Sequence, residues 1–206
     1  MVEVLEQVSA FDGGFSDPVQ ASQRVFRAVM DAMARPGTAH HFPALVAPPA
    51  PLNVVAGAVI CALADADTPV WLDASMAKTG LVRDWVVFHT GAPITSYQSE
   101  AAFALVAEPQ SLSSLNGFAL GSQEYPDRST TLILQVETLS NGPKLVFEGP
   151  GIDGQSTLSP NPMPSHFPTQ WRANRAAFPR GVDLILTAPD GVAALPRSAR
   201  LIMPET

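Results

Sequence analysis

The chain has 206 residues, enough for one domain whose core needs no disulfide or metal to hold it together. Its formal net charge of −7 argues against binding along a nucleic-acid backbone, and 46% hydrophobic residues exclude an intrinsically disordered chain. Only 15% of the residues are charged, against about 25% in a typical soluble domain, which favours a surface partly covered by other subunits.

The first predicted helix begins after Asp17, which suits an N-cap, and Pro18 suits its first position. Apolar residues recur along it at helical spacing, at Val19, Phe26, Val29, Met30 and Met33. Pro36 and Gly37 favour an end at residues 35–37. We expect residues 1–15 to be a flexible N-terminal segment of a single domain that covers residues 1–206.

The middle of the chain predicts alternating helices and strands. Residues 53–64 are apolar on nearly every side, which is typical of a helix covered on most of its surface. A short extended piece precedes this helix over residues 38–42, and a buried strand follows it over 69–72. The pattern then predicts a helix over 76–89, a strand over 102–107 and a single helical segment over 109–115.

The last third of the chain predicts two pairs of strands. Residues 130–138 and 144–148 are joined by Asn141-Gly142, which indicates a hairpin, and residues 183–188 and 191–195 form a second pair. Between the pairs we expect an irregular loop over 149–168 and a helix over 169–178. The alternation predicts the α/β class, as a single domain with a mixed sheet and flanking helices.

The single cysteine, Cys61, lies in an apolar run, so the chain can form neither an internal disulfide nor a cysteine-rich metal site. We expect a buried, inert thiol.

The acidic N-terminus lacks the pattern of a signal peptide, and the longest apolar stretch, residues 54–64, is shorter than the ~20 residues of a membrane span. These features predict a cytoplasmic protein that binds neither membrane nor nucleic acid.

No self-sufficient catalytic motif is found. The glycines of residues 149–154 match a dinucleotide-binding pattern but lack the helix that must follow them. His40 and His41 are neighbours in an extended segment and point to opposite faces, so they do not suit one metal ion. Neither Lys78 nor Lys144 has the surroundings of a Schiff-base lysine. We therefore expect no catalytic residue, no metal and no cofactor.

Cationic side chains near the ends of the predicted elements are the remaining site candidates, because guanidinium groups suit phosphates and carboxylates. Two alternatives stay open. The arginines pair locally, with Asp31 or Asp183 as partners, or at least two of them lie within one cleft that binds an anion or a partner's carboxylates. The candidate anion- or partner-binding residues are Arg35, His89, Arg128, Arg180 and Arg197.

Residues 26–37, with the sequence FRAVMDAMARPG, resemble the N-terminal signature of the H subunit of the bacterial carbon–phosphorus lyase system. Further blocks match that family in the same order, and their number and order make the resemblance specific. They are residues 51–53, 63–72, 88–90, 131–136, 149–152, 178–186 and 195–197. The resemblance covers about residues 11–201, nearly the whole chain.

The resemblance implies a role in the use of phosphonates as a phosphorus source. In that family the H subunit assembles with subunits G, I and J into a core complex that exchanges the adenine of ATP for methylphosphonate on the ribose. This is the alpha-D-ribose 1-methylphosphonate 5-triphosphate synthase activity. The iron–sulfur chemistry belongs to the J subunit, and a chain with one cysteine cannot hold such a cluster. The implied fold is similar to that of pyridoxal-phosphate-dependent transferases without their cofactor site.

Two functions follow as hypotheses. In the first, the chain is a structural or assembly subunit without its own catalytic centre, and it is a homodimer when alone. The low surface charge favours a two-fold interface on the order of 1,000 Å² or more. In the second, it is an anion- or nucleotide-binding subunit that contributes to the transferase site, with a phosphonate or ATP as the ligand.

Overall fold

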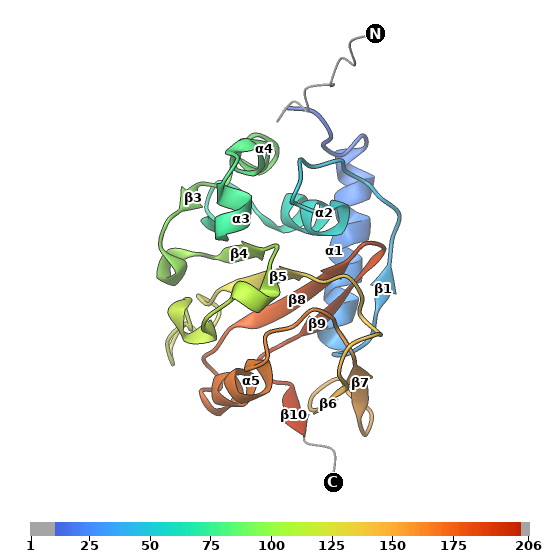
Figure 1. Cartoon of the computed structure of the whole chain (residues 1–206), viewed down its shortest axis with the longest axis vertical. Helices are drawn as coiled ribbons and strands as arrows, with labels where there is room; N and C mark the ends of the chain where they lie inside the picture. The colour runs from blue at the N-terminus through green and yellow to red at the C-terminus, as the bar shows by residue number, and fades with distance from the viewer. Residues whose placement is uncertain (1–10, 203–206) are drawn as a thin grey trace.

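In the computed structural model, which describes residues 11–202, helix α1 (Pro18–Ala34) begins and ends where the sequence predicts (Figure 1). The Asp17 side chain accepts a hydrogen bond from the Gln20 amide, and Gly37 turns the chain with a φ of +83°. One side of α1 is buried against the rest of the molecule, through Ala21, Val25, Val29 and Ala32.

Residues 11–15 are the described part of the N-terminal segment, and they contact helix α4 (Leu81–Thr90). The indole N–H of Trp85 donates to the carbonyl oxygen of Asp12 at 2.9 Å, and the ring of Phe11 lies 5.0 Å from that of Phe88 between centroids. Residues 1–10, for which flexibility is also expected, lie outside the described residues.

A seven-stranded mixed sheet forms the middle layer, in the order β1-β9-β8-β5-β4-β2-β3. Strands β3, β2, β4, β5 and β8 run parallel, and β9 pairs antiparallel with both β8 and β1. The predicted α/β class and mixed sheet are confirmed, as is the last strand pair. The strands are β1 (His40–His41), β2 (Val70–Leu72), β3 (Ile94–Thr95), β4 (Phe103–Val106), β5 (Thr131–Gln135), β8 (Asp183–Ala188) and β9 (Gly191–Leu195).

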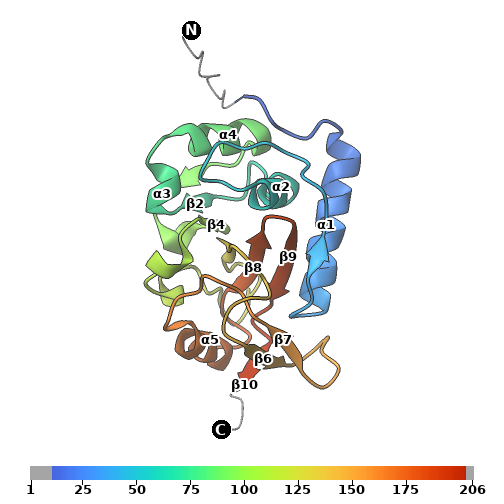
Figure 2. The ribbon, with the colours of Figure 1, turned by 45° about the vertical axis from the view of Figure 1, so that its right-hand side comes forward.

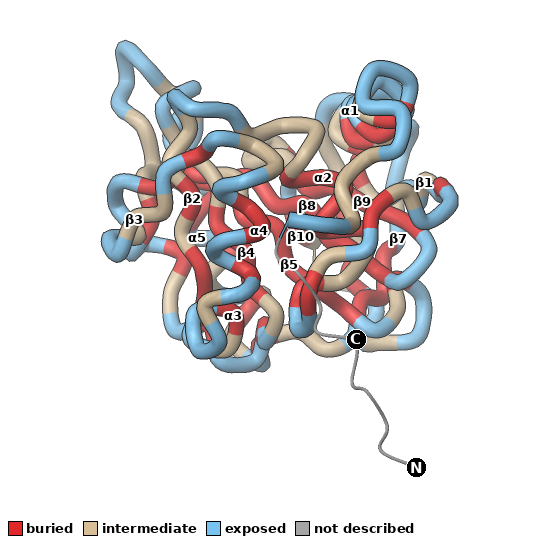
Figure 3. The backbone as a smooth tube through the Cα atoms, turned by 90° about the horizontal axis from the view of Figure 1, so that it is seen from above, coloured by how far each residue is buried: buried red, intermediate tan, exposed pale blue. Residues whose placement is uncertain are grey.

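Both faces of this sheet are covered. Helices α1, α2 (Val54–Leu63) and α4 share one hydrophobic cluster with it, and α5 (Phe167–Ala176) shares the other with a three-stranded sheet. That second sheet has the order β10-β6-β7, with β6 (Leu145–Glu148), β7 (Ser156–Leu158) and β10 (Arg200–Ile202). Figure 2 shows α1 standing along one flank, and Figure 3 shows the buried backbone running through α2 and the central strands.

The hairpin predicted around Asn141-Gly142 is wrong. Strand β5 lies between β4 and β8 and is parallel to both, while β6 belongs to the second sheet. Four of the five residues of β5 are buried, because a central strand of a parallel sheet is covered on both faces. Both of its edges are occupied by other strands, so the chain after β5 has to cross to the second sheet.

Three other boundaries differ from the prediction. The helix expected over 76–89 is two helices, α3 (Ala74–Ala77) and α4, separated at Gly80, whose φ is +71°. The helical segment expected over 109–115 is two short 3-10 helices, Pro109–Ser111 and Leu115–Gly117, and a further one covers Gln98–Glu100. The loop expected over 149–168 contains strand β7 after its glycines.

Buried Asp73 fastens two parallel strands at their carboxyl ends. One oxygen of its carboxylate caps α3 by accepting from the Met76 amide at 2.9 Å. The other oxygen accepts from the amides of Ala107 and Glu108 at 2.7 and 3.0 Å, directly after β4. Asp73 itself follows β2, so this one side chain satisfies backbone donors from two segments that are far apart in sequence.

Replacing Asp73 with alanine is expected to lower the free energy of unfolding by about 2–4 kcal/mol, because buried backbone donors lose their acceptor. Urea unfolding followed by circular dichroism measures this. Asp67→Ala is the matched control, since Asp67 is an exposed loop aspartate, and it is expected to change stability by less than about 0.5 kcal/mol. Equal effects of the two substitutions would contradict the assigned role of Asp73.

Candidate functional site

Arg197 forms a buried ion pair with Asp183 at the start of β8. Its Nε donates to Oδ1 of Asp183 at 3.1 Å, its amide donates to the same oxygen at 2.7 Å, and its Nη2 donates to Oδ2. The guanidinium also donates to the carbonyl oxygen of Pro126 and the hydroxyl of Ser129. The two side chains are only 14% and 13% exposed, and Arg197 binds two other segments of the chain, the start of β8 and the loop before β5.

Arg128 and Arg180 lie at the amino-terminal ends of the neighbouring parallel strands, just before β5 and β8, and both are exposed. The guanidinium of Arg128 stacks 4.3 Å from the centre of the Tyr125 ring. The next residue in the chain, Ser129, accepts a hydrogen bond from Arg197, which places Arg197 beside the backbone that carries Arg128. The backbone around Arg180 is tied down by the Gly181 amide, which donates to the Leu120 carbonyl oxygen at 2.8 Å.

Arg35 follows α1 and is exposed. Its Nη1 lies 3.6 Å from Oδ1 of Asp31, four residues earlier. The ion pairs of Arg35 with Asp31 and of Arg197 with Asp183 are therefore both present, as the local-pairing alternative expects. The exposed pair of Arg35 and Asp31 contributes little to the free energy of unfolding, at most about 1 kcal/mol.

His89 lies on α4 beside a hollow of about 270 Å³, which is also lined by Gly14, Phe15, Pro18 and Cys61. Its Nε2 is 3.2 Å from the carbonyl oxygen of Asp12, and its ring is 4.7 Å from that of Trp85 between centroids. Burial raises the pKa of Cys61 from 9.0 to about 12, because a thiolate would lose its hydration there. The hollow therefore contains a protonated thiol and an imidazole whose Nε2 contacts the backbone.

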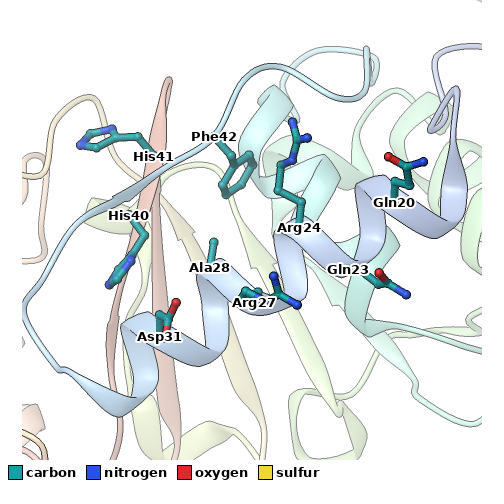
Figure 4. A pocket seen from close by; sticks show the side chains of 9 residues that line it. All are labelled: Gln20, Gln23, Arg24, Arg27, Ala28, Asp31, His40, His41 and Phe42. Carbon is teal, nitrogen blue, oxygen red and sulfur yellow. The ribbon is translucent and has the colours of Figure 1, made fainter.

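A larger hollow of about 540 Å³, the α1/β1 groove, lies between α1 and β1 (Figure 4). Figure 4 shows Arg24 beside Phe42 and Asp31 beside His40. Its cationic residues Arg24 and Arg27 are absent from the candidates that the sequence gives, because on α1 alone they belong to an ordinary polar helix face. The groove is lined by Gln20, Gln23, Arg24, Arg27, Ala28, Asp31, His40, His41 and Phe42.

Across residues 11–202, no three histidine, cysteine, aspartate or glutamate side chains are grouped as metal ligands would be. In the same residues, every helix is too short or too polar to span a bilayer. The glycines of residues 149–154 precede β7 and not a helix, and Gly151 packs so closely that a Cβ there would lie 2.0 Å from the carbonyl oxygen of Ala34. The glycine-rich turn thus serves a close backbone approach to the end of α1.

Replacing Arg197 with alanine is expected to lower the free energy of unfolding by about 3–5 kcal/mol, since the buried carboxylate of Asp183 loses its counter-charge. Arg180→Ala is the control, with an expected change below about 0.5 kcal/mol because its side chain is exposed. Urea unfolding of both variants measures the difference. A small change in the free energy of unfolding for the Arg197→Ala variant would show that the ion pair does not stabilise the start of β8.

Alkylation tests the thiol of Cys61, because only the thiolate reacts. With a pKa of about 12 in place of 9.0, the folded chain at pH 8 has about a thousandfold less thiolate than the unfolded chain. Iodoacetamide should therefore label Cys61 in 8 M urea at least a hundredfold faster than in buffer. The raised pKa also means that stability falls as the pH rises above 9, where the unfolded thiol ionises first. Similar labelling rates in both states would refute the raised pKa.

Comparison with known proteins places the chain in a family. Residues 13–202 match the family described as "Bacterial phosphonate metabolism protein (PhnH)". The chain is 46% identical over 195 residues to "Alpha-D-ribose 1-methylphosphonate 5-triphosphate synthase subunit PhnH" of Rhizobium meliloti (strain 1021), covering 95% of this chain and 97% of that protein. It is 37% identical over 82 residues to "Putative C-P lyase subunit protein HtxG" of Stutzerimonas stutzeri, covering 40% of this chain and 42% of that one. The chain belongs to the PhnH family of bacterial phosphonate metabolism proteins.

Proposed function

We propose that this chain is the H subunit of a carbon–phosphorus lyase core complex and serves the synthesis of alpha-D-ribose 1-methylphosphonate 5-triphosphate in phosphonate catabolism. The observation that carries this proposal is the 46% identity to a subunit of that synthase over nearly the full length of both chains. Identity at this level over nearly the whole of both chains supports the same fold and the same place in a complex.

The role that we propose within the complex is structural, without a catalytic centre of the chain's own. Two buried polar side chains are engaged with the chain itself: Asn174 bonds both backbone groups of Val182, and Gln135 bonds the backbone of Asn53 and Pro51. A polar group committed in this way stabilises the fold and is not free to move protons in a reaction. A role in anion or nucleotide binding at the transferase site is the alternative.

The proposed partners are the G, I and J subunits and, for the isolated chain, a second copy in a two-fold dimer, all in the cytoplasm. An exposed apolar stripe on α1, made of Val19, Phe26 and Met30, supports subunit contacts, because these side chains are 65%, 49% and 51% exposed. Exposed Leu81, Val87 and Phe88 on α4 add a second apolar surface.

We also propose that the fold is related to that of pyridoxal-phosphate-dependent transferases and lacks their cofactor site. The parallel strands of the seven-stranded sheet, covered by helices on one face and by α5 on the other, support the relation. Lys78 and Lys144 are both exposed, which does not suit a Schiff-base lysine held in a cofactor pocket.

Assembly tests the proposed function. Coexpressed with G, I and J subunits of one operon, the chain should copurify with them, and it should restore growth on methylphosphonate to cells that lack their own H subunit. Phe26→Asp should abolish dimer formation of the isolated chain or its copurification while leaving the melting temperature nearly unchanged, because the new charge lies in the apolar stripe.

Ala173→Asp on the exposed side of α5 is the matched control, with no expected effect on either assembly. Sedimentation velocity at micromolar concentration reports the dimer, and affinity copurification reports the complex. A chain that neither copurifies nor supports growth would contradict the proposed function. Full assembly by the Phe26→Asp variant would show instead that the stripe of α1 is not the contact surface.

A further inference from the structure

The α1/β1 groove is a built feature of the fold, because two elements hold it open. Residues 20, 24, 27 and 31 follow one side of α1 at spacings of four, three and four, and therefore share a helix face. Strand β1 is fixed opposite them by its pairing with β9, where His40 is in register with Val192. Phe42, which follows β1, is only 7% exposed and lines the groove together with Ala28.

Unneutralised positive charge gathers in this groove. Among residues 11–202, the side chains of Arg24 and Arg27 make neither a hydrogen bond nor an ion pair. The one carboxylate in the lining, that of Asp31, lies 3.6 Å from the guanidinium of Arg35. His41 faces Asp190 across 3.4 Å, and His40 contacts the hydroxyl of Thr38 at 2.9 Å. Two guanidinium groups therefore remain without a counter-ion on a chain whose net charge is −7.

The donors form a row along the helix. From Gln20 through Arg24 to Arg27 the rise is about 10 Å, at about 1.5 Å per residue, and Gln23 adds a further amide donor beside them. Guanidinium groups bind phosphate oxygens in bidentate fashion, and amides donate single hydrogen bonds. A row of donors of this length matches an extended anion with more than one phosphate better than it matches a single phosphate ion.

Arginines also line a hollow of about 360 Å³ at α5 and β10, which is less suited to an anion. Its Arg200 pairs with Glu148, and the guanidinium of Arg175 stacks 4.7 Å from the centre of the Phe178 ring. Two of its three arginines, Arg175 and Arg200, are thus engaged within the chain, although the Nε of Arg175 is buried without a hydrogen-bond partner among the described residues. The α1/β1 groove is larger, at about 540 Å³, within the range of about 300–1,000 Å³ that is common for small-molecule sites.

We propose that the α1/β1 groove binds the di- or triphosphate group of a small molecule, with Arg24 and Arg27 on successive phosphates and Gln20 and Gln23 as hydrogen-bond donors. The site lies to one side of the apolar stripe, since the two faces of α1 differ by about 100° around the helix axis. It does not depend on the proposed subunit role, because the isolated chain carries all of its residues.

Isothermal titration calorimetry of the purified full-length chain with sodium tripolyphosphate tests the site. At low salt we expect saturable binding of one tripolyphosphate per chain, which weakens as sodium chloride is raised to 0.5 M. Arg24→Ala and Arg27→Ala should each weaken binding about tenfold or more, and the double variant should remove it. Lysine at both positions should retain part of the affinity, because it keeps the charge but loses the bidentate geometry.

Arg83→Ala is the matched control, since Arg83 is an exposed helical arginine outside the groove, and it should bind as the unsubstituted chain does. Tighter binding of ATP than of tripolyphosphate would support a nucleotide as the ligand, and equal binding would support recognition of the phosphates alone. Absence of saturable binding overturns the proposal, as does an equal loss in the Arg83→Ala variant or binding of a hexaglutamate peptide in place of tripolyphosphate. None of these results bears on copurification with the other subunits.

Discussion

Burial of strand β8 on both faces is the constraint on which the rest of the structure depends. All six of its residues are buried, with Ile185 in one hydrophobic cluster and Leu184 and Leu186 in the other. Such a strand has no face for water, so helices must cover one side, and α5 with the second sheet must cover the other. Its polar side chains form hydrogen bonds with backbone groups. Asp183 at the start of β8 accepts from the Arg197 amide, and Thr187 near the end donates to the Leu134 carbonyl oxygen.

This constraint separates two kinds of charged residue. A charged side chain that is buried at the end of a central strand must be paired, which explains why Asp183 and Arg197 are bonded on several sides while Asp73 holds two strand ends. Charges on α1 remain at the surface, because only one side of that helix is buried. Within the described part of the chain, Arg24 and Arg27 therefore stay without a counter-ion on this outer helix, whereas Arg197 at the strand ends is paired with Asp183.

The sequence predicts well what local chemistry determines and fails where distant segments compete. Helix α1 follows from its cap and its apolar spacing, and the β8–β9 pair follows from its turn. The Asn141-Gly142 hairpin fails because β4 and β8 occupy both edges of β5, which no local pattern reveals. Strand β1 lies within the extended piece that is expected over residues 38–42, whereas β3 and β10, of two and three residues, depend on their neighbours and are missed by short patterns.

The same reasoning explains which site residues the sequence could give. Arg197 is a candidate in the sequence because it follows a strand, and in the structure it forms an internal ion pair. Arg24 and Arg27 have the pattern of solvated helix residues, and only the position of β1 shows that they line a groove. A groove between a helix and an edge strand forms only in the tertiary structure, so the sequence alone does not show it. Its net positive charge follows from the structure, in which Asp31 pairs with Arg35 and His41 with Asp190. Since the apolar stripe and the groove occupy different sides of α1, one helix can serve subunit contact with one face and present cations to an anion with another.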